Sequence, residues 1–311
     1  MTTFAPTQSR VEFACFGSQV AASLAGDGDL EPALADIKQF LSTWHLSLTR
    51  FDPASELCRL NADPRRRVPV STIMCRFVAT ALEAAELTGG LVDPTLVDDI
   101  EAAGYSGDLS GSIPLQTALL LAPPRAPARR NPEALWQEIE VDRRERTVTR
   151  PPGVRLDSGG IAKGLCADIL GARLGGHAAY VIDCGGDMRI GGRARLPRAV
   201  RVADPFGGES LHEFEVTNAG VATSGIARRN WLDRQGRVAH HLLDPSTGRP
   251  AFTGVVQASA LAPTAIDAEA LAKAALLSGP ADAPARLRHG GVLVFDDGSF
   301  EVIEPRGVAA H

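Results

Sequence analysis

Cysteine is scarce in this chain of 311 residues, and long apolar runs are absent. The five cysteines are scattered singly and odd in number, which predicts neither a disulfide framework nor a zinc site. No stretch reaches the roughly 18 uninterrupted apolar residues of a membrane-spanning helix, and the first residues lack the pattern of a signal peptide. These absences predict a cytoplasmic protein with no membrane span.

Net positive charge is also missing. The formal charge is -5, so a surface that neutralises nucleic-acid phosphates is not expected. Lysine supplies only three of the 32 basic residues, namely Lys38, Lys163 and Lys273. An ammonium is a compact point charge that the planar fork of arginine does not replace at a tight phosphate site, so the positions of these lysines are informative.

What the chain does contain is an ordinary globular composition with mixed α and β patterns. Apolar periodicity predicts helices at 32–44, 72–87, 161–174 and 265–277. Strands are predicted within 11–24 and at 154–157, 179–184, 199–204, 211–217 and 255–262, with hairpins at 139–150 and 291–305. The stretch 106–135 is rich in Gly, Pro and Arg, which indicates a surface excursion from a single domain over 1–311.

Glycine-rich segments are the first candidates for ligand contact. In Asp157-Ser-Gly-Gly-Ile-Ala-Lys-Gly164, two adjacent glycines precede a predicted helix, so that backbone N–H groups and the helix dipole can bind an anion. A tight turn before the helix is the alternative, because the pattern is neither a P-loop nor G-x-G-x-x-G. Residues 183–187 are predicted to form a hairpin turn. Thr223-Ser-Gly225, followed by Arg228 and Arg229, predicts a polar loop able to bind phosphate or flavin oxygens.

The segment 240–250, HHLLDPSTGRP, has the densest chemistry. Histidine titrates near neutrality and suits proton transfer. Adjacent residues on a strand point to opposite faces, so at most one of His240 and His241 faces a given site, and the pair is a poor metal ligand set.

Six segments, taken in order, resemble the ApbE family of FAD:protein FMN transferases. Any one is weak, whereas six in the family order are hard to obtain by chance. Phe16 stands where the family usually has methionine, and Phe51 where it has tyrosine. The segments are 16–18 (FGS), 49–61 (TRFDPASELCRLN), 90–95 (GLVDPT), 157–164 (DSGGIAKG), 223–225 (TSG) and 241–250 (HLLDPSTGRP).

The resemblance implies an α+β fold of two intertwined sheet-and-helix halves with an FAD cleft between them. It implies transfer of FMN from FAD to a threonine or serine hydroxyl of an acceptor protein, with release of AMP. We assign the base for that hydroxyl to His241 and expect Asp244 and Thr247 to hold the turn of its loop. The residues that the resemblance places in contact with the nucleotide are Phe16, Phe51, Leu91, Val92, Asp93, Asp157, Lys163 and Leu243.

The resemblance also implies Mg²⁺ on the pyrophosphate, held by the carbonyl of Gly160 and by the Asp and Thr of an Ala-Asp-Ala-x-x-Thr helix. Here Glu269 replaces the Asp and Lys273 replaces the Thr, and an ammonium cannot ligate a metal. Two interpretations stay open. Either Lys273 faces the cleft and binds phosphate in place of the cation, or Glu269 and Lys273 form an ordinary surface ion pair.

Two other functions remain open at this point: an FAD-binding protein that has lost transfer, and a hydrolase that converts FAD to FMN and AMP. The chain contains no Asp-[Ser/Thr]-Gly-Ala-[Ser/Thr] segment of the kind modified in known acceptors. The expected acceptor is therefore another protein, met in the cytoplasm.

Overall fold

A twisted antiparallel sheet runs through the computed structural model, which describes residues 7–107 and 112–306. Each pair of neighbouring strands in it is antiparallel. The sheet has eight strands, in the spatial order β1 (Thr7–Cys15), β2 (Ser18–Gly26), β6 (Ala179–Asp183), β7 (Met188–Gly191), β10 (Ala219–Gly225), β15 (Val255–Ala262), β16 (Gly291–Phe295) and β17 (Phe300–Ile303).

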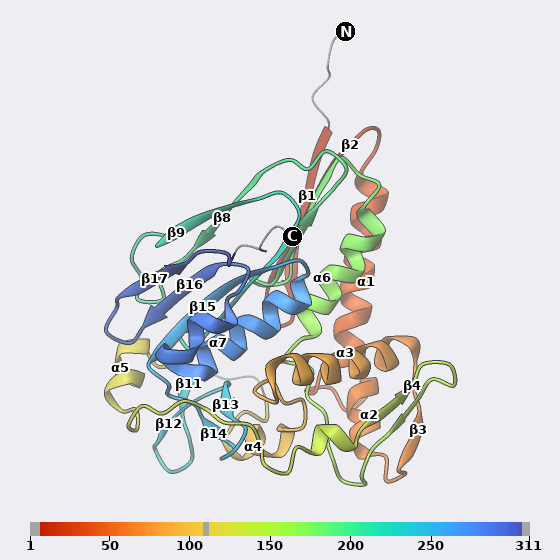
Figure 1. The fold of residues 1–311 in the computed structure, drawn as a ribbon. Helices are drawn as coiled ribbons and strands as arrows, with labels where there is room; N and C mark the ends of the chain where they lie inside the picture. Colours follow the sequence, from red (N-terminus) through yellow and green to blue (C-terminus); the bar gives the residue numbers. More distant parts are fainter. Residues whose placement is uncertain (1–6, 108–111, 307–311) are drawn as a thin grey trace.

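The chain has four long helices: α1 (Glu31–Leu48), α3 (Thr72–Thr88), α6 (Ala162–Leu174) and α7 (Ala265–Arg286). Helix α1 lies against β1 and β2, α6 against β6 and β7, and α7 against β10 and β15, whereas α3 packs on α7 and α1 (Figure 1). Helix α3 has the ends that its sequence predicts: Ser71 accepts the N–H of Met74 at 3.2 Å, and Gly89 adopts the left-handed conformation at φ 68°. The side chain of Trp44 donates to the carbonyl of Ala162 at 2.9 Å and ties α1 to the start of α6.

Two apolar cores divide the molecule into halves. The first core contains Trp44, Leu165 and Ile182, from α1, α6 and β6. The second core is built on β10, β15, β16 and the later turns of α7. Helix α7 contributes Ala265 and Ala270 to the first core, and Ala268, Leu271 and its later turns to the second. The chain is thus α+β, with two sheet-and-helix halves that share a helix and a sheet, as expected; the single domain over 1–311 remains a prediction.

Smaller elements surround these halves, most of them below the large sheet in Figure 1. The helical ones are α2 (Glu56–Ala62), α4 (Val97–Ala102), α5 (Leu115–Leu120) and the 3₁₀ turn η1 (Leu135–Glu138). The sheets are β3 (Arg67–Pro69) with β5 (Thr147–Thr149) and β4 (Glu140–Asp142), and the pairs β8 (Arg198–Val202) with β9 (His212–Val216), β11 (Asn230–Leu232) with β12 (Val238–His240), and β13 (Leu243–Asp244) with β14 (Arg249–Pro250).

Three expectations about the elements need correction. The strand expected at 154–157 is wrong: the side-chain amide of Asn61 donates to the carbonyl of Leu156 and accepts its N–H, so a side chain stands where a partner strand would. The excursion at 106–135 is not confined to the surface, since Leu115 and Ala128 are buried in the second core. Helical structure also continues past the expected stop at 278–280, with a kink at Gly279 (φ 75°).

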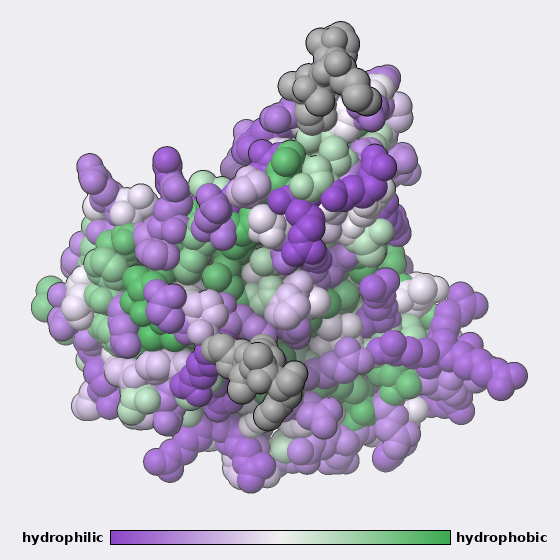
Figure 2. Space-filling model, turned by 45° about the horizontal axis from the view of Figure 1, so that its top comes forward, coloured by the Kyte–Doolittle hydropathy of each residue, from purple (hydrophilic) through white to green (hydrophobic). Residues whose placement is uncertain are grey.

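The surface carries mainly hydrophilic side chains on the face drawn in Figure 2, with apolar ones gathered among them toward its centre-left. Within residues 7–107 and 112–306, we find no helix that is both long and apolar enough to cross a lipid bilayer.

Candidate active site

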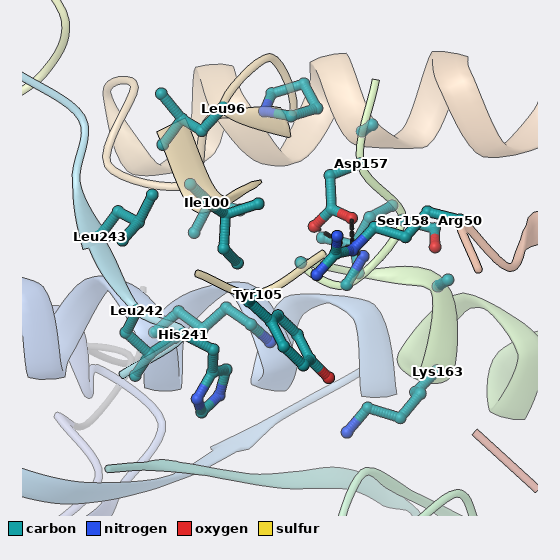
Figure 3. Close-up of a pocket in the computed structure, with 18 of the residues that line it drawn as sticks. Arg50, Leu96, Ile100, Tyr105, Asp157, Ser158, Lys163, His241, Leu242 and Leu243 are labelled. Atoms are coloured by element: carbon teal, nitrogen blue, oxygen red, sulfur yellow. Dashed lines mark hydrogen bonds and ion pairs between the residues drawn. The ribbon is translucent and has the colours of Figure 1, made fainter. Parts of the chain in front are cut away.

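A cleft of about 440 Å³ collects residues from segments far apart in the sequence (Figure 3). It is lined by the α1–α2 and α3–α4 connections, the start of α6, the segment after β12, and α7. The sequence predictions meet here: every predicted site residue but Glu269 lines the cleft. These residues are Phe16, Phe51, Leu91, Val92, Asp93, Asp157, Gly160, Lys163, His241, Leu243 and Lys273.

The glycine loop at the start of α6 forms one wall. Asp157 accepts the N–H of Gly159 at 3.1 Å, and the hydroxyl of Ser158 donates to the carbonyl of Leu48 at 2.7 Å, which fixes the loop against α1. The N-cap residue of α6, Ile161, makes no side-chain hydrogen bond, although the N–H of Gly164 in the first turn is bound by the carboxylate of Glu269. The dipole of α6 gives this end of the helix positive potential, so the loop can receive an anion.

Lys163 projects from the first turn of α6 and forms an ion pair with Asp187, which is 1% exposed in the β6–β7 turn. That turn is the hairpin predicted for 183–187. Burial alone would lower the pKa of Lys163, but the carboxylates of Asp187 and Glu269 outweigh burial and raise it above the ordinary value. The ammonium therefore stays charged beside the cleft.

Glu269 lies behind the cleft wall, fully buried between α7 and α6. One carboxylate oxygen, Oε2, accepts the N–H of Gly164 at 2.8 Å, and Oε1 pairs with Nζ of Lys273 at 2.9 Å. Burial raises the pKa of this carboxyl to about 7 although Lys273 opposes the shift. The surface ion pair that the spacing allowed is therefore wrong: the pair is buried, and Lys273 faces the cleft.

His241 is half-buried beside the cleft, and its Nδ1 atom has no hydrogen-bond partner among the described residues. Burial and the nearby cations, Arg229 foremost, hold its pKa well below the ordinary value. The imidazole is then neutral near pH 7 and free to accept a proton.

His240 is fully buried: its Nδ1 atom accepts the N–H of Leu242 at 3.2 Å, and its ring meets Phe252 edge-on at 4.6 Å. Only one of the two adjacent histidines thus lines the cleft. Asp244 accepts the N–H of Ser246 at 3.0 Å, and its carbonyl accepts the N–H of Thr247 at 3.1 Å, so these residues hold the turn that follows.

The remaining predicted residues form the apolar part of the cleft. Phe51 is 41% exposed, so core packing does not account for it. Phe16 has a positive φ of 56° and meets His45 edge-on at 5.4 Å.

Asp93 is 8% exposed; its Oδ1 atom accepts from Thr95, and its Oδ2 atom has no partner within the described part of the chain. Burial raises the pKa of Asp93.

The polar loop expected at 223–225 is wrong. These residues are the last three of β10, where they pair with β15, and the hydroxyl of Thr223 is 2.7 Å from that of Ser259. From the segment that follows, Arg229 lines the cleft. Its guanidinium lies close to Gly17, where an added Cβ would be 3.8 Å from Nη2.

Arg50 and Tyr105 also line the cleft but were not predicted from the sequence. The sequence could have indicated Arg50, because it precedes Phe51 in the segment 49–61 that resembles the family. Nothing in the sequence indicates Tyr105, since it follows α4 outside every motif. Figure 3 shows Arg50 beside Asp157 on one side, Lys163 and His241 on the other, and the Tyr105 ring between them in this view.

Comparisons with known proteins agree with this arrangement. A family model described as "ApbE family" matches residues 16–295. The FAD:protein FMN transferase of Treponema pallidum is 30% identical over 276 residues, which are 84% of this chain and 75% of that protein. The FAD:protein FMN transferase of Klebsiella pneumoniae is 28% identical over 83% of this chain and 72% of its own.

Solved structures share the fold. The crystal structure of the ApbE protein of Thermotoga maritima superposes with a TM-score of 0.78 at 26% identity, covering 96% of this chain and 97% of that one. The flavinyl transferase ApbE of Pseudomonas stutzeri gives a TM-score of 0.76 at 20% identity, covering 98% and 97%. The second likeness concerns the fold alone.

Proposed function

This chain belongs to the ApbE family, and we propose that it is an FAD:protein FMN transferase. One observation carries the proposal: a single cleft joins an apolar and aromatic wall to a group of cations with a neutral histidine beside them. The apolar and aromatic wall suits the rings of FAD, and the group of cations suits its pyrophosphate.

The proposed reaction displaces AMP from the phosphorus of the FMN half. The hydroxyl oxygen of a threonine or serine in the acceptor forms the new P–O bond, and the P–O bond to AMP breaks. Such a displacement needs the pyrophosphate charge neutralised, the nucleophile held in line and a base for the hydroxyl proton. His241 takes that proton in this proposal.

The cations near His241 match the charge of the pyrophosphate. Lys163, Lys273 and Arg229 line the cleft, and within the described part of the chain only two carboxylates, Asp187 and Glu269, pair with them. Three cations against two carboxylates leave a net positive charge where the diphosphate would lie. The helix dipole at the N-terminus of α6 adds further positive potential on the same side.

The residues present do not fit the Mg²⁺ that the family resemblance implies. Both oxygens of Glu269 already have partners, namely the N–H of Gly164 and the ammonium of Lys273. A divalent cation about 4 Å from an ammonium would be repelled by about 8 kcal/mol at an effective dielectric of about 20. Among the described residues no cluster of three His, Cys, Asp or Glu side chains suits a metal. We therefore infer no ligand role for Glu269 or Gly160 and assign the neutralising charge to Lys273.

The buried pair of Lys273 with Glu269 is also the observation that favours the second candidate, an FAD-binding protein without transfer. One ammonium supplies less charge than a divalent ion and cannot activate an oxygen by coordination. FAD binding would then persist while displacement became slow.

Incubation of the pure chain with FAD separates these functions. With a protein that contains an Asp-[Ser/Thr]-Gly-Ala-[Ser/Thr] segment, the transferase releases AMP and adds the mass of FMN less one water to that protein. Tight FAD binding without AMP indicates the second candidate, and AMP with free FMN in the absence of acceptor indicates hydrolysis. The residue type of the acceptor and its cytoplasmic location stay parts of the proposal.

A further inference from the structure

Arg50 holds a charged group inside the wall of the cleft. It follows α1 in the connection to α2, and its side chain is 7% exposed. The guanidinium carbon lies 4.4 Å from the ring centroids of both Phe51 and Tyr105, whose rings are 5.5 Å apart. Arg50 therefore lies against two neighbouring aromatic side chains at the end of the cleft away from Lys163 and His241 (Figure 3).

The N–H donors of this guanidinium are not satisfied within the described residues. Both terminal nitrogens, Nη1 and Nη2, are buried without a hydrogen-bond partner. The nearest carboxylate oxygens are those of Asp157, 3.5 Å from Nε, and Glu101, 4.0 Å from Nη1. Glu101 is already bound by Arg155 at 2.7 and 2.9 Å. A buried guanidinium with unpaired donors is costly, which points to a partner that arrives from outside the chain.

The position of Arg50 limits what that partner can be. The N–H groups of a guanidinium lie in its own plane, so the free donors of Arg50 point along its edge, toward acceptor atoms lying in that plane. Phe51 is 41% exposed and can turn aside without disturbing either core. A flat ring with acceptors along one edge fits this place. In FAD, the isoalloxazine ring has two carbonyl oxygens and a ring nitrogen on its pyrimidine edge, whereas adenine has no carbonyl.

We propose that Arg50 binds the pyrimidine edge of the flavin ring of FAD and thereby fixes which end of the cleft the flavin occupies. This inference rests on the proposed function, since it takes FAD as the ligand. The pyrophosphate then lies toward Lys163, Lys273 and Arg229, with its FMN phosphorus close to His241. Arg50 orients the substrate and takes no part in the displacement.

The test compares FAD with ADP, which lacks the flavin ring, as ligands of the full chain. Arg50→Met should weaken FAD binding about 10- to 100-fold, the effect of losing charged hydrogen bonds, and change ADP binding less than about twofold. Bound FAD in this variant should also have a lower reduction potential than in the parent, because a cation near N1 favours the reduced ring. Arg201→Met, in a side chain 75% exposed on β8, is the control and should change none of these values.

Unchanged FAD affinity, or equal losses for FAD and ADP, would overturn the role of Arg50. If the methionine variant does not fold, Arg50→Lys is a sufficient test: it keeps the charge but not the planar fork, so FAD affinity should still fall while the reduction potential of bound FAD and the affinity for ADP stay close to the parental values. A lysine variant equal to the parent in FAD affinity would also overturn the role of Arg50. A parent that binds no FAD would instead refute the proposed function.

Discussion

Lys273 and Glu269 stand one helical turn apart on α7, with Nζ and Oε1 separated by 2.9 Å. The carboxylate is fully buried, while the ammonium is 12% exposed and lines the cleft. Glu269 also binds the backbone of α6 through Gly164, so it holds the ammonium in a fixed place between the two halves. Because an ammonium held in one place needs little reorganisation when an anion binds, we expect Lys273 to bind the pyrophosphate of FAD.

FAD binding by the parent should not depend on Mg²⁺, because Lys273 provides the local positive charge. Lys273→Met should weaken binding by about 10- to 100-fold, as expected for loss of a charged contact worth about 1.5–3 kcal/mol. Flavin fluorescence titrations with added Mg²⁺ and with EDTA measure both effects. Lys38→Met, which changes an exposed lysine outside the cleft, is the matched control.

Parental affinity that rises tenfold or more with Mg²⁺ would contradict this prediction. A double variant gives a second test. Glu269→Asp with Lys273→Thr restores the family's pair of ligands, so its FAD binding should become dependent on Mg²⁺. If this variant ignores Mg²⁺ and still binds FAD like the parent, Lys273 does not have the assigned role.

His241→Gln should lower the rate of AMP release about 10²- to 10⁴-fold, the usual contribution of a positioned base. FAD affinity should change little, because a neutral imidazole adds no charge at the pyrophosphate. His212→Gln on β9 is the control. A variant that releases AMP at nearly the parental rate would remove the base role from His241, and His240 could not take it over, since it is fully buried.

The pH dependence of AMP release follows from the same histidine. The pKa of His241 is held well below its ordinary value of 6.5, so the neutral, proton-accepting form persists as the pH falls through 6.5. The acid limb of log kcat/KM, which reports the free enzyme, should therefore lie well below pH 6.5. Profiles between pH 4 and 8 measure it, and a limb centred at or above 6.5 would contradict the assignment.

Local sequence patterns were enough for the parts of the fold that depend on local signals. Ser71 and Gly89 mark the ends of α3, and Gly17 marks the turn between β1 and β2. The segment 154–157 was mistaken for a strand because its apolar alternation is real, while the side chain that satisfies its backbone, Asn61, is about 95 residues away in sequence. No short-range pattern encodes such a partner.

Some residues of the candidate site could likewise be predicted from local sequence patterns, and others could not. Motif residues such as Asp157 and His241 were found because their segments carry unusual Gly, Pro and His content. Tyr105 could not be found, since an isolated tyrosine after a short helix gives no sign of what it faces. Whether Lys273 faced solvent or the cleft was equally undecided, because its spacing from Glu269 suits both, and only the packing of α7 against α6 resolves it.

Phe51→Ala should weaken FAD binding by about 1–3 kcal/mol, or roughly 5- to 150-fold, the scale of a lost stacking contact. The side chain is 41% exposed, so the free energy of unfolding should change little. Phe300→Ala, in a ring 45% exposed on β17 and outside the cleft, is the control for nonspecific effects. A folded Phe51→Ala protein with parental FAD affinity would remove Phe51 from the binding site.

His240 should make the fold sensitive to mild acid. Burial lowers its pKa in the folded chain from 6.5 to about 3. Below pH 6.5 the unfolded chain therefore binds a proton that the folded chain refuses, so the stability contributed above pH 6.5 is lost progressively as the pH falls toward 3. Between pH 7 and pH 5 this linkage should cost about 2 kcal/mol of unfolding free energy.

Urea unfolding at pH 7 and pH 5 measures this cost. His240→Leu should be less stable than the parent at pH 7, because the N–H of Leu242 loses its acceptor. Its stability should nevertheless fall less between the two pH values, by about the 2 kcal/mol assigned to the histidine. The partly exposed His289 provides the control, because His289→Leu removes an imidazole that solvent can reach in the folded chain. Equal pH slopes for the parent and His240→Leu would show that acid sensitivity arises at another group, since no other change in the variant alters proton binding.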